Sequence, residues 1–172
     1  MRGHAWMTCF VILCAIAGAD VAPAQQAAAG CSSAQGPNAT QTLRCRNGLI
    51  VVAEDGAKFT LHGKSGNVDG VDLQSKALLL DAPKQKGSGR FQVITPQAIA
   101  AVRGTRWAVD VQASRTSVFV VNGSVSVRRP SGDRSVTLNA GDGVDADDSG
   151  GPLEVKHWSR ARVSALLARF GQ

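Results

Sequence analysis

Short apolar runs rich in β-branched residues recur along the chain from Gly48 to Ala146. Turn signals such as Asp55-Gly56 and Asn122-Gly123 separate them. Many short strands divided by glycine-bearing turns are typical of an all-β sandwich, barrel or roll. The pattern therefore predicts one all-β domain over residues 48–149, either a β-solenoid-like roll or a sandwich of short strands. The predicted strands are 49–53, 58–61, 71–73, 77–80, 91–95, 99–102, 107–111, 117–121, 125–128, 136–138 and 144–146.

One hairpin is predicted in detail at Asn122-Gly123. This pair favours a type I′ turn, because both central residues of that turn need a positive φ. A two-residue turn there pairs the run 117–121 with the run 125–128. The first of these strands is apolar on both faces, whereas the second has one polar face. Four valines then share one buried face: Val118, Val120, Val125 and Val127.

The period of the pattern changes after Gly150-Gly151-Pro152. Residues 155–170 carry an apolar stripe at helical spacing, which predicts an amphipathic helix within the segment 150–172. Ser159 could cap a shorter helix that begins after it. We expect this helix to cover an open end of the β structure, where unpaired strand edges would otherwise be exposed. In a second interpretation its basic side chains face a partner or a lipid surface: Arg160, Arg162 and Arg169.

The first 24 residues are typical of a signal peptide and not of a fold. A short basic head precedes an apolar stretch from Ala5 to Ala19, which is too short to span a bilayer comfortably. Ala22-Pro23-Ala24 then predicts cleavage before Gln25 and export to the periplasm. The mature chain is expected to hold no transmembrane helix. Ala28-Ala29-Gly30-Cys31 leaves open the alternative of a lipid anchor at Cys31.

Cleavage would remove Cys9 and Cys14 and leave Cys31 and Cys45. Two cysteines in an exported domain most often form a disulfide, since the periplasm is oxidising. Closing a loop of this size stabilises the fold by about 3 kcal/mol in the chain-entropy model. We therefore predict that residues 25–47 form a polar leader pinned by this bond.

Charge and composition limit the classes of function. The net charge of +6 is spread along the chain, and tyrosine is absent, so neither a nucleic-acid surface nor a base-stacking platform is expected. No metal-ligand spacing, nucleophile motif or phosphate-binding loop is complete. We predict neither catalysis nor a bound metal or cofactor. A hydrolase with an unrecognised site would need a buried cleft that holds converging ionisable groups.

The segment 91–143 resembles the FecR domain, the periplasmic module of iron-dicitrate-type sensor regulators. The resemblance depends on Phe91–Thr95 followed by Pro96, on Val102-Arg103-Gly104-Thr105, and on later positions in the same stretch. Its most specific part is the Val-Arg-Gly-Thr sequence after Thr-Pro. The motif residues are Thr95, Pro96, Val102, Arg103, Gly104, Thr105, Trp107, Asn122 and Gly123.

Elementary chemistry assigns structural roles to these motif residues first. Pro96 lacks an N–H and ends a strand, and Gly104 permits a bulge or a bend. Arg103 could hold a turn carbonyl or a carboxylate. Trp107 would fill the core, and its ring N–H would need a partner.

The resemblance implies a module that binds another protein of the periplasm or envelope, with a role in envelope sensing or signalling. The chain is expected to lack the cytoplasmic sigma-factor-binding segment and the membrane helix of the full regulators. The alternative function is a binder of envelope polysaccharide or peptidoglycan through the basic surface.

Overall fold

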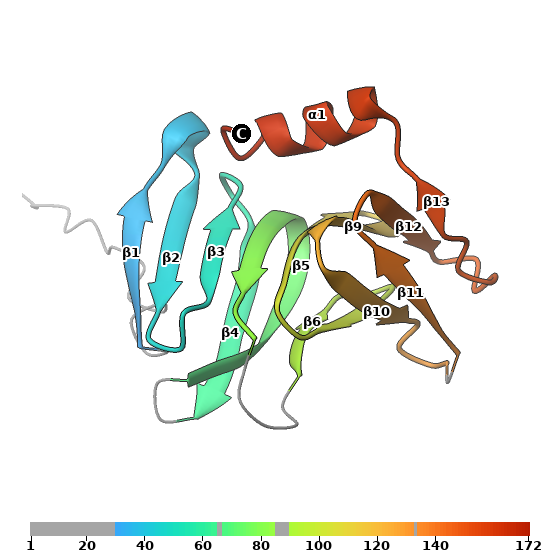
Figure 1. Cartoon of the computed structure of the whole chain (residues 1–172), viewed down its shortest axis with the longest axis horizontal. Helices are drawn as coiled ribbons and strands as arrows, with labels where there is room; N and C mark the ends of the chain where they lie inside the picture. Colours follow the sequence, from blue (N-terminus) through green and yellow to red (C-terminus); the bar gives the residue numbers. More distant parts are fainter. Residues whose placement is uncertain (1–29, 65–66, 85–89, 133) are drawn as a thin grey trace, which may run out of the picture.

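The computed structural model describes residues 30–64, 67–84, 90–132 and 134–172 (Figure 1). These residues form thirteen strands, one short 3-10 helix and one α-helix, so the predicted all-β fold with a C-terminal helix is confirmed. The expected signal peptide lies outside the described residues. The strands are β1 (Cys31–Gln35), β2 (Gln41–Cys45), β3 (Ile50–Ala53), β4 (Lys58–Lys64), β5 (Asn67–Ala82), β6 (Phe91–Ile94), β7 (Ile99–Val102), β8 (Thr105–Gln112), β9 (Arg115–Asn122), β10 (Ser124–Arg128), β11 (Ser135–Asn139), β12 (Asp142–Asp147) and β13 (Lys156–His157).

Strand β5 is sixteen residues long and belongs to two sheets. Its first half pairs with β4 and, in parallel, with β6, whereas its second half pairs with β3 and β8. Lys76, with a φ of 68°, lies where the second half begins. The larger sheet has the order β1-β2-β3-β5-β8-β9-β12-β13, and the smaller has the order β4-β5-β6-β7-β10-β11. The two sheets curl into an open roll (Figure 1), without the parallel stacking of regular coils that defines a β-helix.

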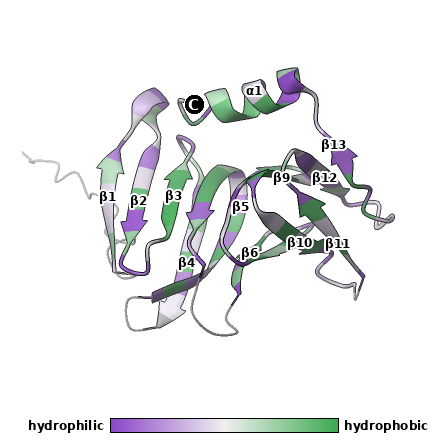
Figure 2. Ribbon diagram, viewed as in Figure 1, coloured by the Kyte–Doolittle hydropathy of each residue, from purple (hydrophilic) through white to green (hydrophobic). Residues whose placement is uncertain are grey.

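The main core lies between the two sheets. Its largest side chain is Trp107 on β8, which has no exposed surface and contacts Phe91 edge-to-face at 5.8 Å between ring centroids. Figure 2 shows the contrast between a strand that faces this core, β3, in hydrophobic colours, and the exposed strand β13, in hydrophilic ones. The core therefore joins strands from the whole length of the described chain.

The predicted hairpin at Asn122-Gly123 is wrong. Strand β9 pairs with β8 and β12, while β10 pairs with β7 and β11. Gly123 alone of the two residues has a positive φ, 89°, so the type I′ turn does not form. The chain instead crosses there from the larger sheet to the smaller one. The four valines do not share one face, because they come from the two sheets, but their predicted burial is confirmed, since all four lie in the main core: Val118, Val120, Val125 and Val127.

This crossing leads to a prediction for Gly123→Ala. A Cβ at this position would lie 2.9 Å from Thr105 Oγ1 and 3.0 Å from the Gly104 carbonyl oxygen, in a backbone conformation that L-residues avoid. We expect the free energy of unfolding to fall by about 2 kcal/mol, measured by urea denaturation. Gly56→Ala is the matched control, since Gly56 also has a positive φ but nothing lies near its Cβ position. Equal losses of unfolding free energy in the two variants would contradict the steric role assigned to the contact of Gly123 with Thr105 and Gly104.

The C-terminal helix α1 spans Arg160–Ala168. It starts five residues later than the full apolar stripe predicts, because Lys156–His157 pair with β12 as strand β13. The Ser159 hydroxyl accepts a hydrogen bond from the Arg162 N–H, as expected for the shorter helix. The helix lies across the outer face of the larger sheet (Figure 1). It covers a second apolar cluster there, formed by Ala77, Leu79, Ala108, Phe119, Trp158, Leu166 and Phe170.

The predicted disulfide between Cys31 and Cys45 is present. It joins β1 to β2, and β2 continues into the larger sheet by pairing with β3, so the segment expected to be a leader contributes two strands. Because the Cys31 sulfur is bonded to Cys45, it has no valence left for a lipid thioether. In the described part of the chain, no helix reaches the length and apolarity that crossing a membrane requires.

Candidate interaction site

Acidic side chains of the larger sheet meet arginines of α1 on the outer face of the molecule. At one end of the helix, Arg162 donates to both carboxylate oxygens of Asp145, at 3.0 and 2.6 Å. Ser117 donates a third hydrogen bond to the same carboxylate, at 2.6 Å. Partial burial alone would raise the pKa of Asp145, but these hydrogen bonds and the charges of Arg162 and Arg115 outweigh it, so the pKa lies below its usual value. Asp145 is therefore an ionised acceptor whose oxygens are already occupied.

A second prediction concerns Arg162→Gln. Without the guanidinium, the pKa of Asp145 should rise, which carboxyl ¹³C shifts measured against pH would detect. A lowered folded-state pKa contributes stability that is present above the unfolded value and is lost as pH falls through the folded value. The wild-type protein should therefore lose this contribution in acid, below about pH 4, and the variant should lack it at neutral pH. An unchanged Asp145 titration in the variant would contradict this account.

Trp158 lies between two partners just before the helix. Its ring stacks on Phe119 with 5.1 Å between centroids, and the Arg162 guanidinium lies 3.4 Å above the ring centroid. Gly143 of β12 lies so close that a Cβ there would fall 2.3 Å from the indole. Trp158 is 7% exposed, and its buried Nε1 has no hydrogen-bond partner among the described residues. Both faces of this aromatic ring are thus occupied from within the chain.

Arg169 forms the corresponding contacts at the other end of the helix. It pairs with Glu54, which follows β3, and with Asp110 in the middle of β8. These hydrogen bonds raise the pKa of Arg169 above its ordinary value, so the side chain stays charged at any accessible pH. Beyond it, the Asn38 side chain donates to the Ala168 carbonyl at 2.9 Å, which ties the helix to the β1–β2 turn.

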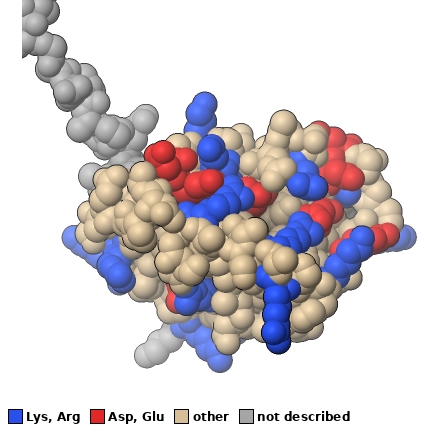
Figure 3. All heavy atoms as spheres, turned by 90° about the horizontal axis from the view of Figure 1, so that it is seen from above, with Lys and Arg blue, Asp and Glu red and all other residues tan. Residues whose placement is uncertain are grey.

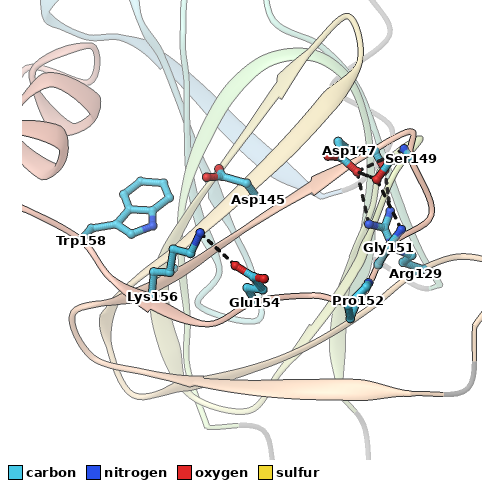
Figure 4. A pocket seen from close by; sticks show the side chains of 10 residues that line it. Arg129, Asp145, Asp147, Ser149, Gly151, Pro152, Glu154, Lys156 and Trp158 are labelled. Atoms are coloured by element: carbon cyan, nitrogen blue, oxygen red, sulfur yellow. Dashed lines mark hydrogen bonds and ion pairs between the residues drawn. The ribbon is translucent and has the colours of Figure 1, made fainter.

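A polar cavity of about 300 Å³ opens beside Trp158, between β12 and the segment 149–158 (Figure 4). Four of its charged side chains pair with one another: Lys156 with Glu154 at 3.0 Å, and Arg129 with Asp147. The fifth, Asp145, is paired with Arg162 outside the cavity lining. Ser149 also donates to Asp147, and these hydrogen bonds lower the pKa of that carboxyl. The arrangement offers paired charges, and no unpaired acid and base face one another across the cavity.

The Thr-Pro part of the family motif forms the turn between β6 and β7. Thr95 is buried, and its N–H donates to the Ala98 carbonyl at 2.9 Å, while Pro96 is exposed. The Thr116 hydroxyl on β9 lies within hydrogen-bond distance of both Thr95 Oγ1 and Gln97 Oε1, at 2.9 and 2.8 Å. Gln97 in turn donates to Asp148 at 3.0 Å. The turn is thus held to the larger sheet by buried polar contacts.

The Val-Arg-Gly-Thr part carries the chain from the smaller sheet to the larger one. Val102 is buried in the core, and Gly104 takes a φ of 70°. Thr105 donates to the Ser124 carbonyl at 2.9 Å, next to Gly123, so the two crossings between the sheets lie against each other. Arg103 is exposed, and no hydrogen bond to a carbonyl or carboxylate is found for it in the described chain.

The three helix arginines do not act alike. Arg160 is exposed, whereas Arg162 and Arg169 point inward onto acids of the sheet. The sequence pattern does not reveal that the acids and Trp158 form one site. The sequence feature that could have indicated the site is Asp110, a carboxylate within the otherwise apolar run 107–111. The described residues contain no group of three or more His, Cys, Asp or Glu side chains arranged to hold a metal ion.

The fold and this site define an all-β module in which a terminal helix is fastened to a curled sheet. The model of the FecR protein family matches residues 35–126, more than half of the chain. This protein therefore belongs to the FecR family. A search of curated proteins found no match.

Two crystal structures share the fold, each of a candidate anti-sigma factor from Parabacteroides distasonis. They are 19% and 18% identical to this chain, with TM-scores of 0.61 and 0.62, and cover 76% and 80% of it. The chain spans 61% and 64% of the length of those proteins. At this identity the likeness concerns the fold.

Proposed function

We propose that this protein is an exported, non-catalytic FecR-type module that binds a protein partner in the periplasm and acts in envelope signalling. The family match is the observation that carries the proposal. The Cys31–Cys45 disulfide supports export, since such bonds persist in oxidising compartments. The fold shared with candidate anti-sigma factors supports a role in signalling.

The state of the acidic residues supports binding over catalysis. A general acid or base needs a carboxyl that can exchange a proton with a substrate at the working pH. The pKa of Asp145 instead lies below its usual value. Glu54 and Asp110 accept hydrogen bonds from Arg169, which caps the end of α1. Side chains fixed in this way suit a rigid scaffold that presents its surfaces and edges to a partner.

The experiment is fractionation and crosslinking of the full chain, carrying a C-terminal tag, in its native bacterium. We expect the protein in the periplasmic fraction, oxidised at Cys31 and Cys45, and crosslinked to one specific protein. A variant without residues 1–24 is the control and should remain in the cytoplasm, reduced and without that crosslink. Cytoplasmic retention of the full chain, or no specific crosslinked protein, would overturn the proposal.

The net charge of +6 favours envelope polysaccharide or peptidoglycan as the second candidate. On the face that carries α1, however, basic and acidic side chains are intermingled (Figure 3). A polyanion would meet few unopposed cations on this face. Co-sedimentation with purified sacculi that weakens as salt is added would favour this second function. No co-sedimentation at low salt would dismiss it.

A further inference from the structure

Strand β11 ends the smaller sheet and has one free edge. It pairs with β10 alone, and no further strand pairs with it in the described part of the chain. At its end, the Asn139 N–H donates to Asp142 Oδ2 at 3.1 Å and so points away from β10. Along an antiparallel strand, successive residues direct their backbone N–H and C=O alternately toward the paired strand and away from it. The backbone N–H and C=O of Ser135 and Thr137 therefore face the free edge too.

A groove of about 830 Å³ lies beside β11, between this strand and the segment 150–153. Val136 from the strand and Leu153 from the segment line it, and both are only partly buried against the main core. Pro152 adds a further apolar surface. A strand added beside β11 would direct every second side chain toward this groove. The groove volume lies within the range of about 300–1,000 Å³ that is usual for binding pockets.

Among the described residues that line the groove, the charged ones are two arginines, Arg129 and Arg134, and none is acidic. The Arg129 side chain is fixed and its charge is opposed, because it donates to the Gly151 and Asp147 carbonyl oxygens and pairs with the Asp147 carboxylate. Arg134 is exposed and supplies the positive charge that a partner can reach. β11 itself carries no charged residue. An extended segment that pairs with β11 therefore binds more tightly when it carries acidic side chains that lie near Arg134.

We propose that β11 is a docking edge to which an extended, acidic segment of the partner protein adds as a new strand. The inference rests on the proposed protein-binding function and names the chemistry of the partner. Main-chain hydrogen bonds to β11 supply affinity, and alternate apolar side chains in the groove supply specificity. The edge strand β1 offers a weaker alternative, because four of its five residues are exposed and its sequence, Cys-Ser-Ser-Ala-Gln, is polar.

The test uses short fluorescent peptides and the full mature chain. One peptide alternates glutamate and valine, a second alternates lysine and valine, and a third alternates glutamate and serine. We expect the glutamate–valine peptide to bind in anisotropy titrations about tenfold more tightly than either of the others. Hydrogen exchange should slow at the amides of Ser135 and Thr137 when it binds.

Three variants locate the contact. Arg134→Glu should weaken binding about tenfold, whereas Lys58→Glu on β4, which changes the net charge equally, should leave it unchanged. Thr137→Pro removes an outward N–H and should abolish binding, with its melting temperature measured to confirm folding. If that variant does not fold, Arg134→Glu and the exchange data still decide the question.

Three outcomes of the peptide and variant measurements would overturn the inference. They are equal binding of the three peptides, equal loss in Arg134→Glu and Lys58→Glu, and no protection of β11. A wild-type dimer dispersed by Arg134→Glu or Thr137→Pro would also overturn it, since the edge would then receive a second copy. A photo-crosslinker at Thr137 separates this inference from the proposed function. If the native partner is captured elsewhere on the surface but never from Thr137, the function stands and the assignment of β11 falls.

Discussion

Replacing Trp107 with alanine is expected to lower the free energy of unfolding by about 3–5 kcal/mol, because it removes the largest side chain of the main core. The indole has no exposed surface and contacts Phe91 of the smaller sheet. Its loss leaves a cavity where the two sheets meet, and the paired strands around it cannot collapse fully. Denaturant titration followed by far-UV circular dichroism measures the change.

Two further variants separate cavity formation from other effects. Trp107→Phe keeps most of the volume and removes an indole N–H that has no partner among the described residues. The free energy of unfolding should therefore fall clearly less than in Trp107→Ala. Val155→Ala truncates an exposed side chain and should change the stability by less than about 0.5 kcal/mol. If Trp107→Ala behaved like Val155→Ala, this description of the core would be wrong.

The second large effect is expected for Arg169→Met, which leaves Glu54 and Asp110 without their cation. Removing one partner of a buried ion pair typically costs about 3–5 kcal/mol, since an uncompensated charge remains. Here the arginine side chain is 30% exposed, so solvent screens part of the effect and we expect a loss of about 2–3 kcal/mol. The exchange rates of α1 amides should also rise, because the helix loses its anchor near the C-terminus.

Arg160→Met is the matched control for this prediction. Arg160 lies on the same helix and is exposed, so the substitution should leave stability within about 0.5 kcal/mol of wild type. Equal effects of the two substitutions would show that the ion pairs do not hold the helix.

The strand pattern could be predicted from the sequence because alternation and turn residues are local signals. Alternation correctly predicts that Val118 and Val127 are buried, although they reach the core from different sheets and not from one face. Their strands were wrongly paired, however, because a turn signal does not reveal which edges are already taken. Strand β9 pairs with β8 along one edge and with β12 along the other, so it does not pair with β10. The choice of partner strand depends on contacts that are distant in sequence.

The candidate site shows the same limit more strongly. The basic residues of the helix were identified, but a helical pattern cannot say whether an arginine faces solvent or another element. Arg169 contacts Glu54 across 115 positions of sequence. Only the folded sheet brings these two side chains together. The helix also begins later than the sequence pattern predicts, because the pairing of β13 with β12 outweighs the helical pattern at Lys156.

The shared strand β5 has a consequence for how this protein folds. Each half of β5 lies between neighbouring strands of a different sheet, so loss of β5 removes the central support of both sheets at once. Neither sheet can therefore persist as an independent folding unit, and unfolding should be a single cooperative transition. Several of its pairings also join distant parts of the chain, which gives a high contact order and slow folding. Under the proposed export, the chain would remain a target for periplasmic proteases until β5 is in place.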